Sequence, residues 1–499
     1  MDLELLLSMA TSFDADRPAI SELDGATLST GELDRLASGA ASMFLDAGAT
    51  RIAFCDTNGL AFPLALFGAV KARIPFVPLN YRLSDDQLGR IVRSDEMVAV
   101  ASPQQGDRLR ALGLMKVFGS SELLALARAA CSPLTDRPPL DPDEVALLLY
   151  TSGTTGAPKA AILRHRHLAS YVINTVEFAS AAPEDATLLS VPPYHIAGVM
   201  NLLSNLYMGR RIVYLDTFSP ERWISGVREQ GVTHVMLVPT MLSRVVAAMG
   251  SGEVDLPSLR TISYGGSKMP RPVIERALRL LPAVGFTNAY GLTETSSTVS
   301  LLGPEDHRQA LDSEEPEVGA RLGSVGIPLP GVEIQVRDES GEPCEPGVSG
   351  DIFVRGEQVA GEYVGASTGG DSWFETRDRG HVDRAGYLFI EGRTDDTIIR
   401  GGENISPVEV EEVLLSHPDV ADCAVVGIED EEWGQRIAAA VVGVAGAAVD
   451  VDELKTFALA SLRGAKAPEL IVVVDELPYT ETGKLLRRVV REDLQRISS

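Results

Sequence analysis

The segment Thr151-Ser-Gly-Thr-Thr-Gly-Ala-Pro-Lys159 decides how the rest of this 499-residue chain is interpreted. It combines hydroxyl groups, two glycines and one ammonium group, which together suit a polyphosphate. The apolar run Val145-Ala-Leu-Leu-Leu-Tyr150 precedes it and predicts a buried strand, so the polar groups should emerge at a strand end. The spacing differs from G-x-x-x-x-G-K-S/T, which excludes the usual P-loop motif. Taken alone, the segment also fits a polar surface loop.

The length and the net charge of the chain exclude several classes of protein. A chain of 499 residues exceeds what one hydrophobic core supports and predicts two to four domains. Lys and Arg total 44 against 70 Asp and Glu, a net charge of −26 that disfavours binding to nucleic acid or to an anionic membrane. The longest apolar stretch, 437–449, is shorter than the ~20 residues of a membrane-spanning helix, so no integral membrane association is expected.

The N-terminus and the cysteines indicate a compartment. Residues 1–9 carry acids where a secretory signal needs bases. The four cysteines are scattered without a C-x-x-C pair, which predicts neither disulfides nor zinc and favours the reducing cytoplasm. Composition does not fix the oligomeric state.

Apolar runs alternate with helical patterns from residue 30 to about 215, and similar units recur later. The segment 30–45 shows the helical pattern, with Leu33, Leu36, Ala40, Met43 and Phe44 on one face. This alternation predicts parallel sheets covered by helices. Between Gly331 and Arg355, short alternating strands predict a small antiparallel sheet.

The last hundred residues read as a compact α+β unit. Ser406-Pro-Val-Glu409 predicts a helix start, with Ser406 as N-cap, Pro at N1 and Glu409 at N3. Strands are expected at 423–428, 437–442 and 470–474, and helices at 452–463 and 485–495. The charged segment 392–396 is the expected joint.

The fold class expected from these patterns is α/β. It comprises a large N-terminal domain of stacked sheets with covering helices and a small antiparallel sheet, residues 1–394, and a small α+β C-terminal domain, residues 395–499.

Further segments follow the opening one in a fixed order: Asn288-Ala-Tyr-Gly-Leu-Thr-Glu294, Thr376-Arg-Asp-Arg-Gly380 with Gly386 to Arg393, Gly401-Gly-Glu-Asn-Ile405, and Thr482-Gly-Lys484. With 151–159, this ordered set resembles the superfamily of adenylate-forming enzymes, which includes acyl- and aryl-CoA synthetases, luciferases and nonribosomal adenylation domains. The resemblance covers most of the chain.

The resemblance implies binding of ATP, Mg²⁺ and CoA by specific residues. Tyr290 offers an aromatic face to adenine, Asn288 reads the base edge, and Asp378 and Arg393 bind the ribose. Each of these side chains also has an ordinary alternative, as a core aromatic or a surface ion-pair partner. The full set of residues implied to bind nucleotide or CoA is Thr151, Ser152, Gly153, Thr154, Thr155, Gly156, Lys159, Asn288, Ala289, Tyr290, Gly291, Asp378, Ile390, Arg393, Gly401 and Gly402.

The resemblance also implies the catalytic groups. Lys484 is the cation that bridges the attacking carboxylate and the α-phosphate during adenylation. Thr293 lies beside that phosphate, and Glu294 is the oxygen ligand for Mg²⁺. His195 corresponds to a histidine between the acyl site and the phosphate, although a His beside Tyr and Ile also fits a satisfied core residue.

Glycines border the implied acyl pocket, namely Gly198, Gly265 and Gly266, and Asp395 corresponds to the hinge of a mobile C-terminal domain. The chain departs from the family pattern at three positions. Arg377 and Ala160 stand where Gly is usual, and Ala465 precedes Lys466 where an aromatic is common. These departures bear on loop conformation and on the CoA channel.

The expected function is that of an AMP-forming carboxylic acid:CoA ligase, which makes an acyl-AMP and transfers the acyl group to CoA. The partners are a small carboxylic acid, ATP and CoA. The identity of the acid stays open between fatty, alicyclic and aryl acids. An enzyme that loads a carrier protein, an acyl-AMP oxygenase and a non-catalytic nucleotide-binding protein are the alternatives, and the net charge of −26 favours CoA over an acidic carrier protein.

Overall fold

The computed structural model describes residues 1–23, 25–92, 97–130, 139–151, 159–250, 255–364, 373–401, 403–430, 433–444, 448–462, 466–480 and 485–498. The chain divides into two compact units. Unit 1 comprises residues 1–322, 327–333 and 354–374, and unit 2 comprises residues 323–326, 334–353 and 375–499. The predicted boundary after residue 394 stays a prediction.

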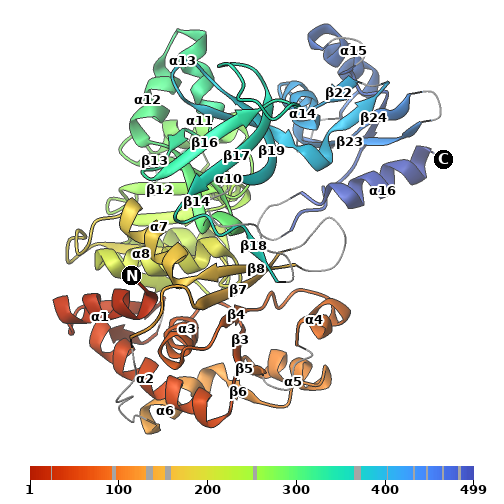
Figure 1. Ribbon diagram of the computed structural model, residues 1–499. Helices are drawn as coiled ribbons and strands as arrows, with labels where there is room; N and C mark the ends of the chain where they lie inside the picture. The colour runs from red at the N-terminus through yellow and green to blue at the C-terminus, as the bar shows by residue number, and fades with distance from the viewer. Residues whose placement is uncertain are drawn as a thin grey trace. The chain divides into compact units, whose positions relative to one another are not determined.

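Unit 1 contains two large sheets (Figure 1). The nine-stranded sheet has the order β15-β14-β13-β12-β11-β9-β10-β1-β2 and the seven-stranded sheet β18-β8-β7-β4-β3-β5-β6. The strands of the first are β1 (Pro18–Glu22), β2 (Thr27–Ser29), β9 (Ala186–Leu189), β10 (Arg211–Tyr214), β11 (His234–Leu237), β12 (Thr261–Gly265), β13 (Gly285–Leu292), β14 (Ser297–Leu302) and β15 (Ile327–Pro328). Those of the second are β3 (Arg51–Cys55), β4 (Phe76–Pro78), β5 (Met97–Ala101), β6 (Val117–Gly119), β7 (Val145–Thr151), β8 (Lys159–Arg164) and β18 (Glu362–Tyr363).

The helices of this unit are α1 (Leu3–Phe13), α2 (Thr30–Asp46), α3 (Ala61–Ala72), α4 (Asp85–Val92), α5 (Pro103–Ala111), α6 (Ser120–Ala129), α7 (His165–Thr175), α8 (Ile196–Met208), α9 (Pro220–Glu229), α10 (Pro239–Met249), α11 (Arg271–Leu280), α12 (Pro304–Asp312) and α13 (Pro316–Ala320), with short 3₁₀ turns η1 (Thr293–Thr295) and η2 (Arg321–Gly323). Helix α2 matches the predicted segment, and its N-cap Ser29 forms a capping box with Glu32.

The central strands of both sheets are parallel, as predicted. Alternate residues of a strand face opposite cores, as the two-residue period requires. Ile52 and Phe54 of β3 join the core under α2 and α3, whereas Ala53 and Cys55 join the core under α4 and α5. The antiparallel edges, β7 with β8 and β13 with β14, are features that the alternation pattern did not predict.

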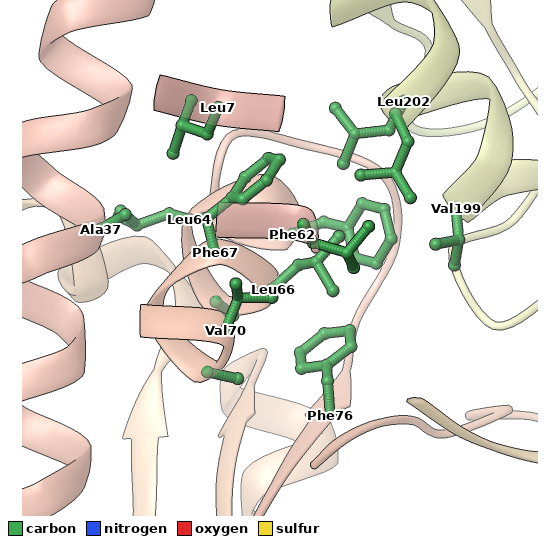
Figure 2. Close-up of a cluster of buried hydrophobic side chains, with 14 of the residues drawn as sticks. Leu7, Ala37, Phe62, Leu64, Leu66, Phe67, Val70, Phe76, Val199 and Leu202 are labelled. Carbon is green, nitrogen blue, oxygen red and sulfur yellow. The ribbon is translucent and has the colours of Figure 1, made fainter. Parts of the chain in front are cut away.

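The largest core joins elements from both sheets. Figure 2 shows Leu7 of α1, Ala37 of α2, Phe62 of α3 and Leu202 of α8 gathered beside Phe76 of β4. Helix α8 packs on β9 and β10 of one sheet, and its neighbour α7 packs on β7 and β8 of the other. Phe62 and Phe76 are fully buried, and truncating such a side chain typically costs about 3–5 kcal/mol. This core therefore fixes the two sheets relative to each other within unit 1.

Unit 2 contains most of a four-stranded sheet, β16-β17-β19-β20, a two-stranded sheet and the three-stranded sheet β23-β24-β25. Its elements are β16 (Val332–Arg337), β17 (Gly350–Gly356), β19 (Phe374–Val382), β20 (Leu388–Arg393), η3 (Thr394–Asp396), β21 (Ile398–Arg400), β22 (Glu403–Ile405), α14 (Pro407–Leu415), β23 (Val420–Asp430), β24 (Gly434–Gly443), α15 (Val451–Ser461), β25 (Leu470–Val473) and α16 (Arg487–Ser498).

The three-stranded sheet is covered on both faces. Val425 and Ala439 belong to the core under α14 and α15, and Ala424 and Ala438 to the core under α16. The predicted elements of this region are present, and α14 begins as predicted, with Ser406 at the N-cap position and Pro407 at N1; only the side-chain capping contacts differ from the prediction. The Ser406 hydroxyl donates to the Glu391 carbonyl instead of capping the helix, and the Glu409 carboxylate pairs with Lys466.

No helix among the described residues is long and apolar enough to span a bilayer.

Candidate active site

The polar segment 151–159 connects two antiparallel strands. Thr151 at the end of β7 and Lys159 at the start of β8 are partners across the ladder. Ser152, Gly153, Thr154, Thr155 and Gly156 lie outside the described residues, and Thr151 is described by its backbone alone. The Lys159 side chain is exposed. Because the next element is a strand, the predicted phosphate contacts would come from the connecting segment and not from a helix N-terminus.

Glu294 lies close to β8, the strand that begins at Lys159, although the two are far apart in sequence. It belongs to η1, and only 8% of its surface is exposed. The Tyr363 hydroxyl donates to Glu294 Oε1 at 2.5 Å, and Tyr363 is the partner of Ala161 in β8. The Glu294 carbonyl accepts from the Ala360 N–H at 2.8 Å. Two of the predicted motifs therefore converge at one sheet edge of unit 1.

An ion pair holds the strand that carries Tyr363. Arg164 of β8 donates to both carboxylate oxygens of Glu362, with Nη2–Oε2 at 2.8 Å and Nε–Oε1 at 3.3 Å. The hydrogen bond from Arg164 lowers the pKa of Glu362, so the carboxylate is charged at neutral pH. A bidentate contact of this kind sets the orientation of β18 against β8.

The surroundings of Glu294 fit a magnesium ion carried by a nucleotide. Among the described residues, no cluster of three or more His, Cys, Asp or Glu side chains forms a protein-only metal cage. Mg²⁺ is usually held by one or two carboxylates together with phosphate oxygens and water. A single buried carboxylate, fixed by Tyr363, matches that donor set.

The backbone after Glu294 is strained. Ser296 and Ser297 have φ values of 55° and 100°, in the region that favours glycine. The Ser296 hydroxyl donates to the Gln358 carbonyl at 2.8 Å, and Gln358 Nε2 donates to the Thr298 carbonyl at 2.7 Å. Strain of this kind persists only where surrounding contacts impose it, and here it sets the direction of η1.

The remaining residues of this motif, Asn288, Ala289, Tyr290 and Gly291, lie half-buried along β13, and Thr293 begins η1. Strand β12 runs parallel beside β13. A Cβ atom on Gly265 would stand 2.1 Å from the Ala289 carbonyl oxygen, so the absence of a side chain there permits close backbone packing.

Gly198 is similar, because a Cβ atom would stand 2.7 Å from the Pro192 carbonyl oxygen. Gly266 has φ of 89°. The structure thus explains these glycines by close backbone packing or by a positive φ, whereas the sequence suggested room for substrate. Their position beside an acyl pocket stays a prediction.

His195 stands at the N-cap position of α8, where its side chain makes no capping hydrogen bond. The ring is half-buried and lies 4.6 Å from the Tyr194 ring, between centroids, and Tyr194 in turn meets Tyr81 edge-on at 5.3 Å. His195 thus begins the helix that follows β9, at the carboxyl end of a parallel strand, where α/β proteins commonly bind ligands.

In unit 2, the two residues predicted to bind the ribose are brought together. Asp378 of β19 and Arg393 of β20 are partners across the antiparallel ladder, with Arg393 Nε 3.7 Å from Asp378 Oδ1. Asp378 is 7% exposed, and its N–H donates to the Thr376 hydroxyl at 3.1 Å. Ile390 lies on the same strand as Arg393 and is half-buried.

The two departures at glycine positions differ in their structural consequences. Ala160 pairs with Tyr150 in a regular antiparallel ladder, where the backbone accommodates a residue with a Cβ atom without strain. Arg377 has φ of 60°, in the left-handed region where every residue with a Cβ atom is strained. The Arg377 guanidinium lies 3.8 Å from Asp395 Oδ2, with both side chains more than a third exposed, so the ion pair contributes little stability.

Arg377→Gly should therefore be more stable than Arg377→Ala by about 1 kcal/mol, because both variants lose the ion pair but only glycine relieves the left-handed strain. Urea denaturation of the two variants side by side measures this difference. Equal midpoints and slopes for the two would contradict the assignment of strain to residue 377.

The other predicted residues of unit 2 lie on either side of β21. Asp395 belongs to η3, before that strand. Gly401 follows it with φ of 57°, and its N–H donates to the Trp433 carbonyl at 2.8 Å. A Cβ atom on Gly401 would stand 2.9 Å from the Trp433 ring, so this position requires glycine. Gly402 and Lys484 lie outside the described residues.

Several residues that hold this site carry no signal in the sequence. Tyr363 and Gln358 contact the Glu294 motif from more than 60 positions away along the chain, and neither stands in a recognisable pattern. No spacing signal in one sequence reports such long-range partners.

Comparison with known proteins identifies the family. The family model described as AMP-binding enzyme matches residues 9–364, and the model described as AMP-binding enzyme C-terminal domain matches residues 409–484. The chain belongs to the AMP-binding enzyme family. The predicted family is thereby confirmed, and so is the α/β fold with a small C-terminal region.

Individual relatives of this AMP-binding enzyme cover nearly its whole length. A feruloyl-CoA synthase of Amycolatopsis sp. is 34% identical over an alignment of 480 positions, gaps included, which covers 94% of each chain. A fatty acid–[acyl-carrier-protein] ligase of Streptomyces coeruleorubidus is 32% identical over an alignment of 511 positions, gaps included, which covers 97% of this chain and 96% of the relative.

The solved structure of o-succinylbenzoate CoA synthetase of Bacillus subtilis with an acyl-adenylate intermediate has a TM-score of 0.85 and 27% identity, covering 97% of both chains. Another structure of that protein contains ATP and a magnesium ion. These findings confirm the predicted enzyme class, an ATP-dependent acyl-CoA synthetase, and agree with the predicted use of ATP, Mg²⁺ and CoA.

Proposed function

We propose that this enzyme is an AMP-forming acid:CoA ligase that works in two steps. A carboxylate attacks the α-phosphorus of ATP, forming an acyl-AMP and releasing pyrophosphate. The thiol of CoA then attacks the acyl carbon, and AMP leaves. The observation that carries the proposal is the buried Glu294, held by Tyr363 beside the strand that begins at Lys159. This arrangement brings the proposed magnesium ligand Glu294 close to the strand that follows the proposed phosphate-binding segment, within unit 1.

The predicted phosphate-, adenine- and ribose-binding residues divide the tasks of the first step. Lys159 and the hydroxyls and amides of 151–156 bind the phosphates, while Tyr290 and Asn288 bind adenine. Bound Mg²⁺ would neutralise phosphate charge beside Glu294, with Thr293 near the α-phosphate. Asp378 accepts hydrogen bonds from the ribose hydroxyls and Arg393 donates to the same sugar, a role that their pairing across β19 and β20 supports.

The acyl acceptor is proposed to be CoA. The similarity to a carrier-protein ligase supports a second candidate, the loading of an acyl carrier protein. The net charge of −26 opposes association with an acidic carrier and favours the free thiol of CoA. The feruloyl-CoA synthase supports an aryl acid as substrate, and the fatty acid ligase supports a fatty acid.

A panel of hydroxycinnamic, arylacetic, alicyclic and fatty acids tests the proposal. Each acid is incubated with enzyme, ATP and Mg²⁺, with either CoA or a phosphopantetheinylated carrier protein, and the products are identified by mass. The expected result is acyl-CoA together with AMP and pyrophosphate. Acylated carrier protein without acyl-CoA would favour the second candidate, and the absence of adenylate and thioester with every acid would refute both.

The second step requires a different presentation of residues 395–499, since Lys484 and CoA cannot approach the acyl phosphate together. Asp395 is the proposed hinge, and 1–394 and 395–499 are the bodies that move. Asp395→Pro should leave adenylation within about twofold and slow thioester formation at least tenfold, because proline fixes φ at the pivot. Rapid-quench measurement of acyl-AMP and acyl-CoA in one reaction separates the steps. Equal losses in both would argue against this hinge.

The cytoplasm is the proposed compartment, supported by the scattered cysteines.

A further inference from the structure

A buried ion pair stands immediately after the segment that carries Lys484. Arg487, at the start of α16, donates to both carboxylate oxygens of Glu411 in α14, with Nη1–Oε1 at 2.5 Å and Nη2–Oε2 at 2.8 Å. The two side chains are only 16% and 11% exposed. Burial lowers the pKa of the Arg487 guanidinium, but the carboxylates of Glu411 and of Asp396, which lies 3.6 Å away, raise it overall. A bidentate pair this enclosed fixes the positions of both helices.

The pair also completes the edge of a sheet. Strand β23 is an outer strand of its three-stranded sheet, and Val425 lies on it. The Val425 N–H donates to Glu411 Oε1 at 2.8 Å, and Arg487 Nη1 donates to the Val425 carbonyl at 2.7 Å. The two charged side chains thus supply the acceptor and the donor that a neighbouring strand would supply. Arg487 therefore anchors α16 to the backbone of β23.

A second contact anchors the other end of the same segment. Tyr479 and Leu485 are bridge partners, and the Leu486 N–H donates to the Pro478 carbonyl at 2.8 Å. The Tyr479 hydroxyl donates to Asp422 of β23, with oxygen–oxygen distances of 2.9 and 3.1 Å. The described residues that precede and follow 481–484 in the chain are thus both anchored on β23. Lys484 is three residues from Arg487, a tether of at most about 11 Å.

We propose that Arg487 and Glu411 are positioning residues for adenylation, which fix the start of α16 on β23 and so confine the segment that carries Lys484. The inference rests on the proposed function of Lys484. It holds that Arg487 and Glu411 act through the position of Lys484 and do not touch the substrate themselves. Nothing in the family resemblance singled out these two residues. The rate of adenylation depends strongly on the position of a cation that acts at one phosphate oxygen, since a displacement of about 1 Å can lower the rate about 100-fold.

The test replaces Arg487 and Glu411 together, because removing Arg487 alone would leave the buried Glu411 carboxylate without its guanidinium partner. In Glu411→Gln/Arg487→Met, ATP–pyrophosphate exchange at saturating substrates should fall about 100-fold, with KM for ATP within about threefold of wild type. Formation of acyl-CoA from purified acyl-AMP and CoA should stay within about threefold. Arg488→Gln is the matched control, because Arg488 is the next residue of α16 and pairs with the exposed Glu492; full activity is expected.

Coupling to Lys484 distinguishes positioning from a general structural role. In a Lys484→Ala background, the double variant should cause no further loss of exchange. An equal fall of both half-reactions, or the same 100-fold loss in that background, would overturn the proposal. If the double variant does not fold, Arg487→Lys carries the test, with about a tenfold loss of exchange expected and an unchanged rate contradicting it. Synthesis of acyl-CoA by wild type and Arg488→Gln verifies the ligase function independently of these outcomes.

Discussion

Lys484→Ala should slow formation of the acyl adenylate by about a thousandfold. The lysine bridges an incoming carboxylate and the α-phosphate, two anions that repel each other. A cation about 4 Å away at an effective dielectric near 20 contributes about 4 kcal/mol, which corresponds to about three decades in rate. ATP–pyrophosphate exchange measures this step directly.

The same variant should convert purified acyl-AMP and CoA to acyl-CoA at nearly the wild-type rate, since the second step does not join two anions at that atom. Lys455→Ala is the control, because it removes a lysine from α15 of the same unit. Exchange at the wild-type rate in Lys484→Ala, with the rest of the chain intact, would remove Lys484 from the mechanism.

Glu294→Gln has the second largest expected effect. Glutamine keeps the size of the side chain and an oxygen that accepts from Tyr363, but it loses the charge that a magnesium ion requires. We expect kcat/KM for MgATP to fall about a hundredfold or more, about 3 kcal/mol, and half-saturation to need more Mg²⁺. Melting temperature should change little, because the buried hydrogen bond survives.

Tyr363→Phe is the matched control for Glu294→Gln. It removes the hydrogen bond but leaves the carboxylate, so its effect on MgATP should be much smaller, about tenfold or less. An Mg²⁺ titration of both variants separates the contributions. If Glu294→Gln kept the wild-type Mg²⁺ dependence, the carboxylate could not be the metal ligand.

Local patterns predicted the elements of this fold well, and long-range partners poorly. Helix α2 follows from periodicity, because burial on one face leaves a signal within a few residues. The strands β3, β5 and β12 follow from short apolar runs, and β3 and β5 are buried on both faces. Helix α14 begins at the predicted position, with Ser406 at its N-cap, but the Ser406 hydroxyl and the Glu409 carboxylate contact distant partners that local spacing cannot report.

The candidate site shows the same division. The motif around Glu294 was visible in the sequence, whereas its partner Tyr363 was not, because a contact across 69 positions depends on how β18 pairs with β8. Asp378 and Arg393 were predicted to share a sugar, and their ladder partnership places them together. Gly198 and Gly265 were predicted to leave room for a substrate. In the structure, a side chain at either position would instead collide with a backbone carbonyl oxygen.

Transfer of an oxygen atom tests the two-step mechanism most directly. When the acid carries ¹⁸O in both carboxylate oxygens, attack on the α-phosphorus places one ¹⁸O in the bridge of the acyl-AMP, and thiol attack leaves that atom on AMP. Mass spectrometry should therefore find one ¹⁸O in each AMP, one in each acyl-CoA and none in pyrophosphate. AMP without the label, formed at the rate of acyl-CoA synthesis, would contradict an acyl adenylate and with it the two-step mechanism.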